Sequence, residues 1–182
     1  MRKKVLSLRF FNRPTITVAK DLLGKFLIRN IGRKTIAVQI TEVEAYDGPH
    51  DKASHASRGR TPRNTPMFGE AGRFYVYFTY GMHWMLNIVT GPNDYPAAVL
   101  IRSGKLKVQS GKSAEINGPA RLTKYLKIDK RLNGKSADWR NGLWLENRGT
   151  PVRKVNIVAR PRVGVDYAGR WAKKLYNFKI RQ

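Results

Sequence analysis

Two carboxylates and a tyrosine fall on one side of a short strand-like stretch. Residues 40–46 read ITEVEAY and are rich in β-branched side chains. Because side chains alternate between the two faces of a strand, Glu42, Glu44 and Tyr46 share a face with Ile40. A carboxylate beside an aromatic wall could act as a general base next to a bound ring. Solvated acids on an edge strand are the alternative interpretation.

A cation that ends an apolar run is a candidate partner for one of these acids. Arg102 follows the segment AAVLI at residues 97–101. A buried unpaired charge is costly, so Arg102 needs a carboxylate, and Glu44 is available. A neighbouring cation favours the ionised carboxylate, which is the form that a base requires. We therefore expect an ion pair between Glu44 and Arg102 at the edge of a pocket.

Residues 47–55, DGPHDKASH, bring together two histidines and two aspartates. Such a set could bind a metal, but its spacing matches no zinc or iron signature. We expect no metal here. The preferred interpretation is that His55 makes polar or stacking contacts with a ligand.

Three arginines follow in the segment SRGRTPRN, residues 57–64. Arg58, Arg60 and Arg63 lie in a loop that contains glycine and proline, and such a loop could follow a phosphate backbone. A solvated charge run is the alternative.

The overall charge favours a polyanionic partner. Lysine and arginine number 36 and aspartate and glutamate 12, which gives a net charge of +24. A nucleic acid is the expected partner, ahead of a membrane surface, because no amphipathic basic helix stands out. A surface that is basic only for solubility, or a ribosome-associated protein, remains an alternative.

Without cysteine, disulfides and thiolate metal sites are excluded. The N-terminus does not resemble a secretory signal, and no apolar run reaches the roughly 18 residues of a membrane span. We therefore expect an intracellular protein.

The elements that must position these side chains are irregularly ordered. The predicted elements are a helix at 15–29 weakened by Gly24, strands at 34–46, 74–80, 84–90, 97–103, 142–146 and 152–165, loops at 47–73 and 104–117, and a helix at 119–128. Because strands and helices do not alternate regularly, residues 1–182 are expected to form a single mixed α+β domain.

Several longer blocks resemble the alkyladenine (3-methyladenine) DNA glycosylase family. In chain order they are TEVEAYDGPHDKASHASRGRTPRN, MFGEAGRFYVYFTYGMHWMLNIVT, AVLIRS, NGPARLTKYLKI and RVGVDYAGRWAKK, spread over about residues 10–178. The resemblance implies a curved, largely antiparallel sheet with flanking helices and a protruding β-hairpin. It also implies a monomeric enzyme without a cofactor, acting with intracellular double-stranded DNA that contains damaged purines.

The activity that the resemblance implies is base excision repair. Such enzymes flip an alkylated or deaminated purine out of the duplex and hydrolyse its N-glycosidic bond with water, without lyase activity. Glu44 stands where the family has its general base, and Arg102 where an arginine holds the water and the carboxylate. The carbonyl around Val163 resembles the backbone contact to that water.

The resemblance also assigns the base pocket. Tyr46, His55 and Tyr77 resemble the residues that sandwich and read the flipped base, and Asn87 resembles the residue that crowds the amino group of guanine. Tyr80 resembles the side chain that fills the hole in the duplex from the minor groove.

Two departures from the family pattern concern residues 104–117, which are shorter than in some relatives, and Asp129–Glu146, which match only loosely. The rival interpretations are a non-catalytic nucleic-acid-binding protein on the same fold, and an enzyme acting on RNA or free nucleosides. The first would need a damaged catalytic pair, whereas Glu44 and Arg102 are both present.

The aromatic run YVYFTYGMHW, residues 75–84, is typical of a core strand when taken by itself. Alternation places Val76, Phe78 and Tyr80 on one face. The chain is expected to turn at Gly81, which would expose Tyr80 at a hairpin tip. The prediction is therefore an exposed Tyr80 with Val76 and Phe78 buried.

Overall fold

The longest strand, β3 (Lys34–Asp47), carries both carboxylates of the ITEVEAY stretch. The structure is a computed structural model that describes residues 4–107, 113–149 and 151–181. The other strands are β1 (Lys4–Val5), β2 (Phe26–Ile31), β4 (Phe74–Thr79), β5 (His83–Val89), β6 (Ala97–Lys107), β7 (Ser113–Ile116), β8 (Leu143–Asn147), β9 (Ile157–Arg160) and β10 (Asn177–Ile180). The α-helices are α1 (Leu8–Phe11), α2 (Thr15–Leu22) and α3 (Pro119–Tyr125). Short 3-10 turns are η1 (His55–Arg58), η2 (Thr65–Phe68), η3 (Lys130–Leu132), η4 (Trp139–Asn141), η5 (Lys154–Asn156) and η6 (Asp166–Trp171).

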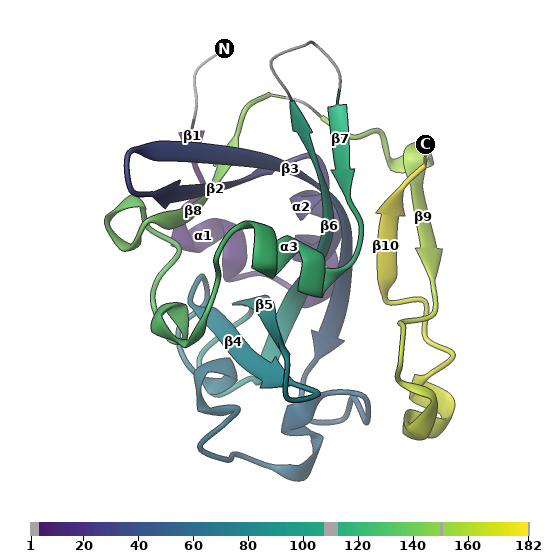
Figure 1. Ribbon diagram of the computed structural model, residues 1–182. Helices are drawn as coiled ribbons and strands as arrows, with labels where there is room; N and C mark the ends of the chain where they lie inside the picture. The colour runs from purple at the N-terminus through teal and green to yellow at the C-terminus, as the bar shows by residue number, and fades with distance from the viewer. Residues whose placement is uncertain (1–3, 108–112, 150, 182) are drawn as a thin grey trace.

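All described strands belong to one sheet, and every pairing in it is antiparallel. The main path runs β1-β8-β2-β3-β6-β5-β4, with β7 added beside β6 and the β9–β10 pair added beside β3. Figure 1 shows the long strands β3 and β6 bending across the molecule, with α2 and α3 against the sheet. The predicted α+β class with a curved antiparallel sheet is confirmed. No described helix is long and apolar enough to cross a membrane.

A continuous apolar core lies between the sheet and these helices. Val18, Ala19 and Leu22 of α2 and Leu122 of α3 are fully buried in it. Near the end of β3, Val43 and Ala45 point into this core. The side chains that alternate with them therefore point away from it. That opposite face is where the carboxylates lie.

The predicted helix over 15–29 is wrong in its second half. Helix α2 ends at Leu22, Leu23 is extended and Gly24 has a φ of +80°, a conformation that glycine adopts readily. The following residues form β2, which is hydrogen-bonded to both β3 and β8. Phe26, which suggested a longer helical face, is therefore the first residue of a strand whose buried side chains are Leu27 and Ile28.

Two irregularities shift the register where β3 meets β6. Ile40 pairs with Gly104 and Glu42 with Ser103, whereas Val43 pairs with Ile101, so Thr41 and Arg102 each lack a direct partner in the ladder. The expectation that Ile40 shares a face with the glutamates is therefore wrong. Ile40 lies in the same buried cluster as Val43, because an extra residue in a strand flips the side chains that follow it.

Strands β4 and β5 form the protruding hairpin that the sequence predicted. Tyr80 and Gly81 at its tip have φ values of 52° and 64°, and Tyr80 is 82% exposed, so the predicted exposure is confirmed. Val76 is buried as expected, but Phe78 is 42% exposed, and its ring packs against the Trp84 ring with centroids 4.7 Å apart. The prediction for Phe78 is wrong because this part of the hairpin projects beyond the core.

Two other predictions, a loop over 104–117 and a strand over 152–165, also differ from the structure. The predicted loop over 104–117 begins and ends within strands β6 and β7, while residues 108–112 lie outside the described part of the chain. Lys105, Ser113 and Glu115 interrupt the apolar pattern of these two strands, so the sequence gave no clear strand signal there. The predicted strand over 152–165 is reduced to β9, and the chain leaves the sheet after it to approach the carboxylates.

Candidate active site

A cavity of about 320 Å³ opens between the hairpin β4–β5, strand β3 and the segment after β9. Eight of the residues predicted from the sequence line it: Glu44, Tyr46, His55, Tyr77, Tyr80, Asn87, Arg102 and Val163. They come from four separate parts of the chain, so the fold brings together what the sequence keeps apart.

Glu44 is completely buried and its carboxylate is held by four donors. The Val163 N–H and the Asn177 amide donate to Oε1 at 2.8 and 3.1 Å. The Tyr46 hydroxyl donates to Oε2 at 3.0 Å, and Arg102 Nη1 lies 3.1 Å from the same oxygen. A buried carboxylate is tolerable only with such partners. The predicted pair of Glu44 and Arg102 is confirmed, and the alternative of solvated acids on an edge strand is excluded for Glu44.

Glu42 lies beside this pair and shares two of its partners. Arg102 Nε and the Asn177 amide donate to Glu42 Oε1 at 3.0 and 2.9 Å, and the Ser103 hydroxyl donates to Oε2 at 2.9 Å. Burial by itself would raise the pKa of Glu42. The hydrogen bonds from Asn177 and Ser103 and the charge of Arg102 outweigh it, so the pKa lies below its usual value. Arg102 thus bridges two carboxylates, and its position in the bulge of β6 aims it at both.

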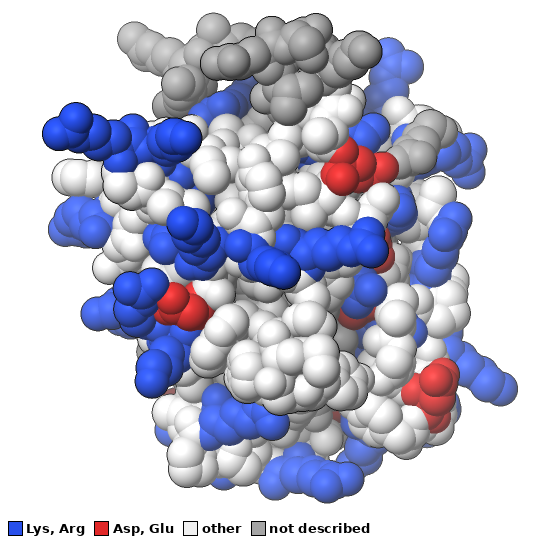
Figure 2. Space-filling view, viewed as in Figure 1, with Lys and Arg blue, Asp and Glu red and all other residues white. Residues whose placement is uncertain are grey.

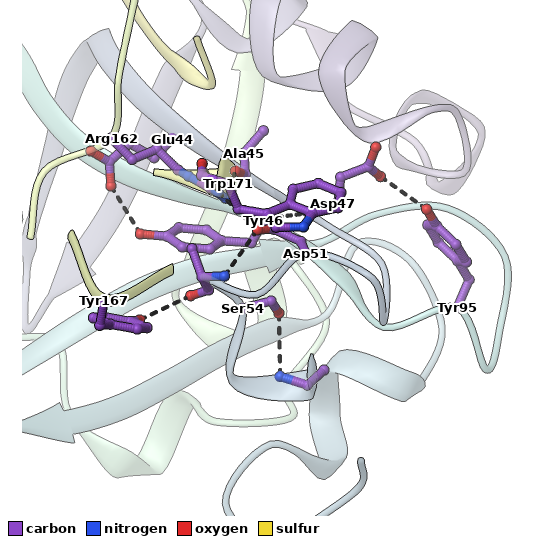
Figure 3. A network of polar contacts seen from close by, with 12 residues as sticks. Glu44, Ala45, Tyr46, Asp47, Asp51, Ser54, Tyr95, Arg162, Tyr167 and Trp171 are labelled. Atoms are coloured by element: carbon purple, nitrogen blue, oxygen red, sulfur yellow. Dashed lines mark hydrogen bonds and ion pairs between the residues drawn. The ribbon is translucent and has the colours of Figure 1, made fainter. Parts of the chain in front are cut away.

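A second buried ion pair supports the cavity from behind. Arg162 and Asp51 are both fully buried and meet in a two-pronged contact, with Arg162 Nη2 donating to Asp51 Oδ1 at 2.8 Å. Arg162 Nη1 also donates to the Ala45 carbonyl at 2.8 Å, and the guanidinium lies 4.8 Å from the Tyr46 ring centroid. Arg162 Nη2 also donates to the Trp171 carbonyl at 3.3 Å. Figure 3 shows the Tyr46 hydroxyl directed at Glu44.

This contact fixes two walls of the cavity relative to each other. Arg162 precedes Val163, whose N–H reaches Glu44, and Asp51 precedes the turn that leads to His55. Burial and the neighbouring Glu44 raise the pKa of Tyr46 well above its usual value, so this phenol stays protonated and donates. The sequence singled out Asp51 only within a metal-binding alternative, and its only signal for Arg162 is the place of that residue at the start of the RVGVDYAGRW block. It gave no signal for Asn177.

A small aromatic group forms the wall opposite β3. The His55 ring lies 4.6 Å from that of Tyr77 at an angle of 76°, and His55 Nδ1 is hydrogen-bonded to the Tyr75 hydroxyl at 2.9 Å. Burial raises the pKa of Tyr77 to about 12 and raises that of Tyr75 as well. Burial and the charge of Arg63 lower the pKa of His55. Near neutral pH this wall is therefore uncharged.

Asn87 and Tyr167 complete the lining. Asn87 is buried on β5, and its amide donates to the Tyr75 carbonyl at 3.1 Å, which fixes its orientation. Tyr167, which the sequence analysis missed, is 70% exposed at the cavity and donates its hydroxyl to the Ala53 carbonyl at 3.2 Å. Its only sequence signal is its place within the RVGVDYAGRW block.

The loop arginines lie outside the cavity lining. Arg60 is paired with Asp94 and stacks on Phe68 at 4.5 Å. Arg63 donates to the Phe78 carbonyl at 2.9 Å and lies over the Tyr77 ring. Arg58 is exposed at the end of η1. Among the described residues, no group of three or more His, Asp or Glu side chains is placed to hold a metal ion.

Residues 9–182 match the family described as methylpurine-DNA glycosylase. A protein of Methanocella arvoryzae named "Putative 3-methyladenine DNA glycosylase" is 45% identical over 185 residues, which cover 96% of this chain and 91% of that protein. Proteins of the same name from Streptomyces avermitilis and Legionella pneumophila strain Corby are 44% and 41% identical. The first covers 90% of this chain and 83% of its own length, and the second 94% and 92%.

Proposed function

Since the chain belongs to the methylpurine-DNA glycosylase family, we propose that it is a monofunctional base-excision-repair glycosylase. Its substrates are alkylated or deaminated purines in intracellular double-stranded DNA, and residues 1–182 act as one monomeric domain. The observation that carries the proposal is a buried, fully hydrogen-bonded Glu44 paired with Arg102 at the wall of an aromatic cavity.

The cavity suits a purine that has left the base stack. A base inside a duplex cannot be reached by a recessed carboxylate, so the nucleotide must rotate out of the helix. Tyr46 on one wall and His55 with Tyr77 on the other offer ring faces to a flipped purine. Asn87, held by its bond to the Tyr75 carbonyl, limits the space beside the base, which disfavours the amino group of guanine. Tyr80 at the exposed hairpin tip takes the place of the flipped base in the duplex.

The chemistry follows from the charge that develops on the sugar. Breaking the N-glycosidic bond leaves oxocarbenium-like positive charge, which the Glu44 carboxylate stabilises while it takes a proton from the attacking water. Arg102 and the Val163 N–H hold the carboxylate in one orientation. A cationic alkylated base is a good leaving group and needs little protonation. The nucleophile is water rather than a lysine, so borohydride should trap no covalent complex with DNA.

Replacement of Glu44 by glutamine tests this proposal. A general base contributes typically 10²–10⁴ in rate, so single-turnover release of a methylated purine should fall by about that factor. Binding to the same duplex should stay within a few fold. The Tyr46 hydroxyl can rotate to accept from the new amide, and Arg102 keeps Glu42 as a carboxylate partner, so the fold should persist.

The matched control is Glu70→Gln, which removes an exposed acid paired with Arg73 and should leave base release unchanged. Release at the native rate by Glu44→Gln would overturn the assigned chemistry. A native protein that binds damaged DNA but frees no base would favour the non-catalytic alternative.

A further inference from the structure

A run of exposed cations follows α3 away from the cavity. We call Arg121, Lys124, Lys127, Lys130 and Lys135 the α3 band; all five are exposed. Among the described residues, none of the five lies within ion-pair distance of a carboxylate, whereas the neighbouring Arg131 is paired with Asp129 at 2.6 Å. Arg29 and Arg131, the other cations of this region, are directed to carbonyls and to Asp129. The band therefore carries uncompensated positive charge.

Helix α3, which carries the first two band residues, begins at the cavity, and the band lies beside the hairpin that carries Tyr80. Pro119, the first residue of α3, lines the cavity. The Thr123 hydroxyl donates to the Trp84 carbonyl of β5 at 2.8 Å, and the Phe74 N–H of β4 donates to the Lys135 carbonyl at 2.8 Å. Figure 2 shows Lys and Arg side chains crossing this face over α3, directly above the uncharged surface of the β4–β5 hairpin.

Two of the three loop arginines expected to contact the phosphate backbone are less free than this band. Arg60 has a carboxylate partner, and Arg63 is bonded to the backbone of the hairpin. By contrast, the exposed lysines of the band, Lys124 on α3 and three that follow the helix, keep all three ammonium donors for a ligand. Charge complementarity therefore favours the band as the place where a polyanion lies.

We propose that the α3 band binds the phosphate backbone of the DNA that flanks the flipped nucleotide. This inference rests on the proposed function. Arg121 and Lys124 are three positions apart on one helical face, and α3 with its seven residues extends about 10 Å. Each strand of B-DNA rises about 3.4 Å per phosphate. Together with the segment that follows the helix, the band is long enough to meet several successive phosphates while Tyr80 enters the duplex.

The test compares two triple variants that each remove three positive charges. The band variant is Arg121→Gln/Lys124→Gln/Lys127→Gln. The control is Arg33→Gln/Lys34→Gln/Lys154→Gln, whose residues are exposed at the β2–β3 turn and in η5, away from the hairpin. Affinity for an undamaged duplex is measured between 50 and 200 mM NaCl. The slope of log K against log salt is negative, and each lost phosphate contact reduces its magnitude by about 0.9. The magnitude should therefore fall by about 2–3 in the band variant and by less than about 1 in the control.

Base release separates this inference from the proposed function. No band residue lines the cavity, so single-turnover release at saturating protein should stay within about twofold of the native rate. Equal slopes for native protein and band variant, with base release intact, would overturn the inference alone. Equal losses in both triple variants would also overturn it, because they indicate a diffuse field. A native protein that neither binds DNA nor releases a base would instead overturn the proposed function. Thermal melting checks folding, and the single charge reversal Lys124→Glu repeats the test should the triple variant be unstable.

Discussion

At the scale of single residues, the site depends on neutralising two adjacent carboxylates without giving them access to bulk water. Glu42 and Glu44 share Arg102 and the Asn177 amide, and Glu44 gains two further donors from Val163 and Tyr46. Burial by itself would raise the pKa of Glu42, and these donors and the charge of Arg102 outweigh it. The same donors fix the carboxylate before substrate arrives, which is the preorganisation that a charged transition state requires.

His55 predicts how activity changes with pH. Burial and the charge of Arg63 lower its pKa below the usual 6.5, so the ring is neutral at pH 7 and gains a proton only below pH 6.5. A protonated ring would repel a cationic methylated base. Base release from such a lesion should therefore decline as pH falls from about 7 to 5, and part of that decline should disappear in His55→Asn. Single-turnover rates across this pH range measure it.

The exposed His50 supplies the control, because His50→Asn should keep the native pH profile. The decline should also be shallower for neutral hypoxanthine, which a charged ring does not repel. An acid limb that is identical in His55→Asn and native protein would exclude His55 as the cause of the decline.

At this scale, the sequence predicts those site residues whose type or position in a strand is unusual, such as a charge at the end of an apolar run. Glu44 and Arg102 could be paired because a buried charge demands a partner. Asn177 and Arg162 could not be found in this way, because each is one of many polar or cationic residues and acts only through distant segments. Arg162 meets Asp51 across 111 positions, a separation that no local periodicity reports.

At the scale of elements, the sequence predicted β3, the hairpin and α3 well, because each has a periodic pattern with clear boundary residues. It failed where pairing overrides local preference. Residues 26–29 form a strand because β3 and β8 flank them on both sides. The bulges at Thr41 and Arg102 depend on how two strands match, and neither strand signals them alone. Those bulges decide which side chains reach the cavity.

The Arg162–Asp51 pair couples the C-terminal segment to the rest of the site, and Asp51→Asn tests this coupling. Removing one partner leaves a buried, uncompensated guanidinium, which costs about 3–5 kcal/mol in free energy of unfolding. Denaturant melts should show this loss. Base release from folded protein should fall as well, because the segment that carries the Val163 N–H loses its anchor.

The exposed pair of Arg60 and Asp94 is the matched control. Asp94→Asn should change stability by less than about 1 kcal/mol, since exposed ion pairs contribute little, and asparagine tolerates the positive φ at this position. A small loss in Asp51→Asn, similar to that of the control, would contradict an anchoring role for the buried pair.

At the scale of the whole molecule, most acidic side chains are paired with nearby arginines, so the excess positive charge lies on unpaired basic side chains at the surface. Arginines lie within ion-pair distance of these acids: Asp21, Glu42, Glu44, Asp51, Glu70, Asp94, Asp129, Asp138 and Glu146. With 36 basic and 12 acidic residues, most lysines are left to repel one another. Such a surface attracts DNA from a distance and at the same time strains the free protein.

Salt should therefore act in opposite directions on the free and the DNA-bound protein. Raising NaCl from about 20 to 300 mM screens the self-repulsion of the net charge of +24, so the melting temperature of the free protein should rise, by about 2–4 °C for each kcal/mol recovered. The added stability from a bound duplex should shrink over the same range, because counterion release drives binding less strongly at high salt. Calorimetric melts with and without DNA measure both effects. A melting temperature of the free protein that falls with salt would mean that surface ion pairs, rather than repulsion among lysines, dominate its electrostatics.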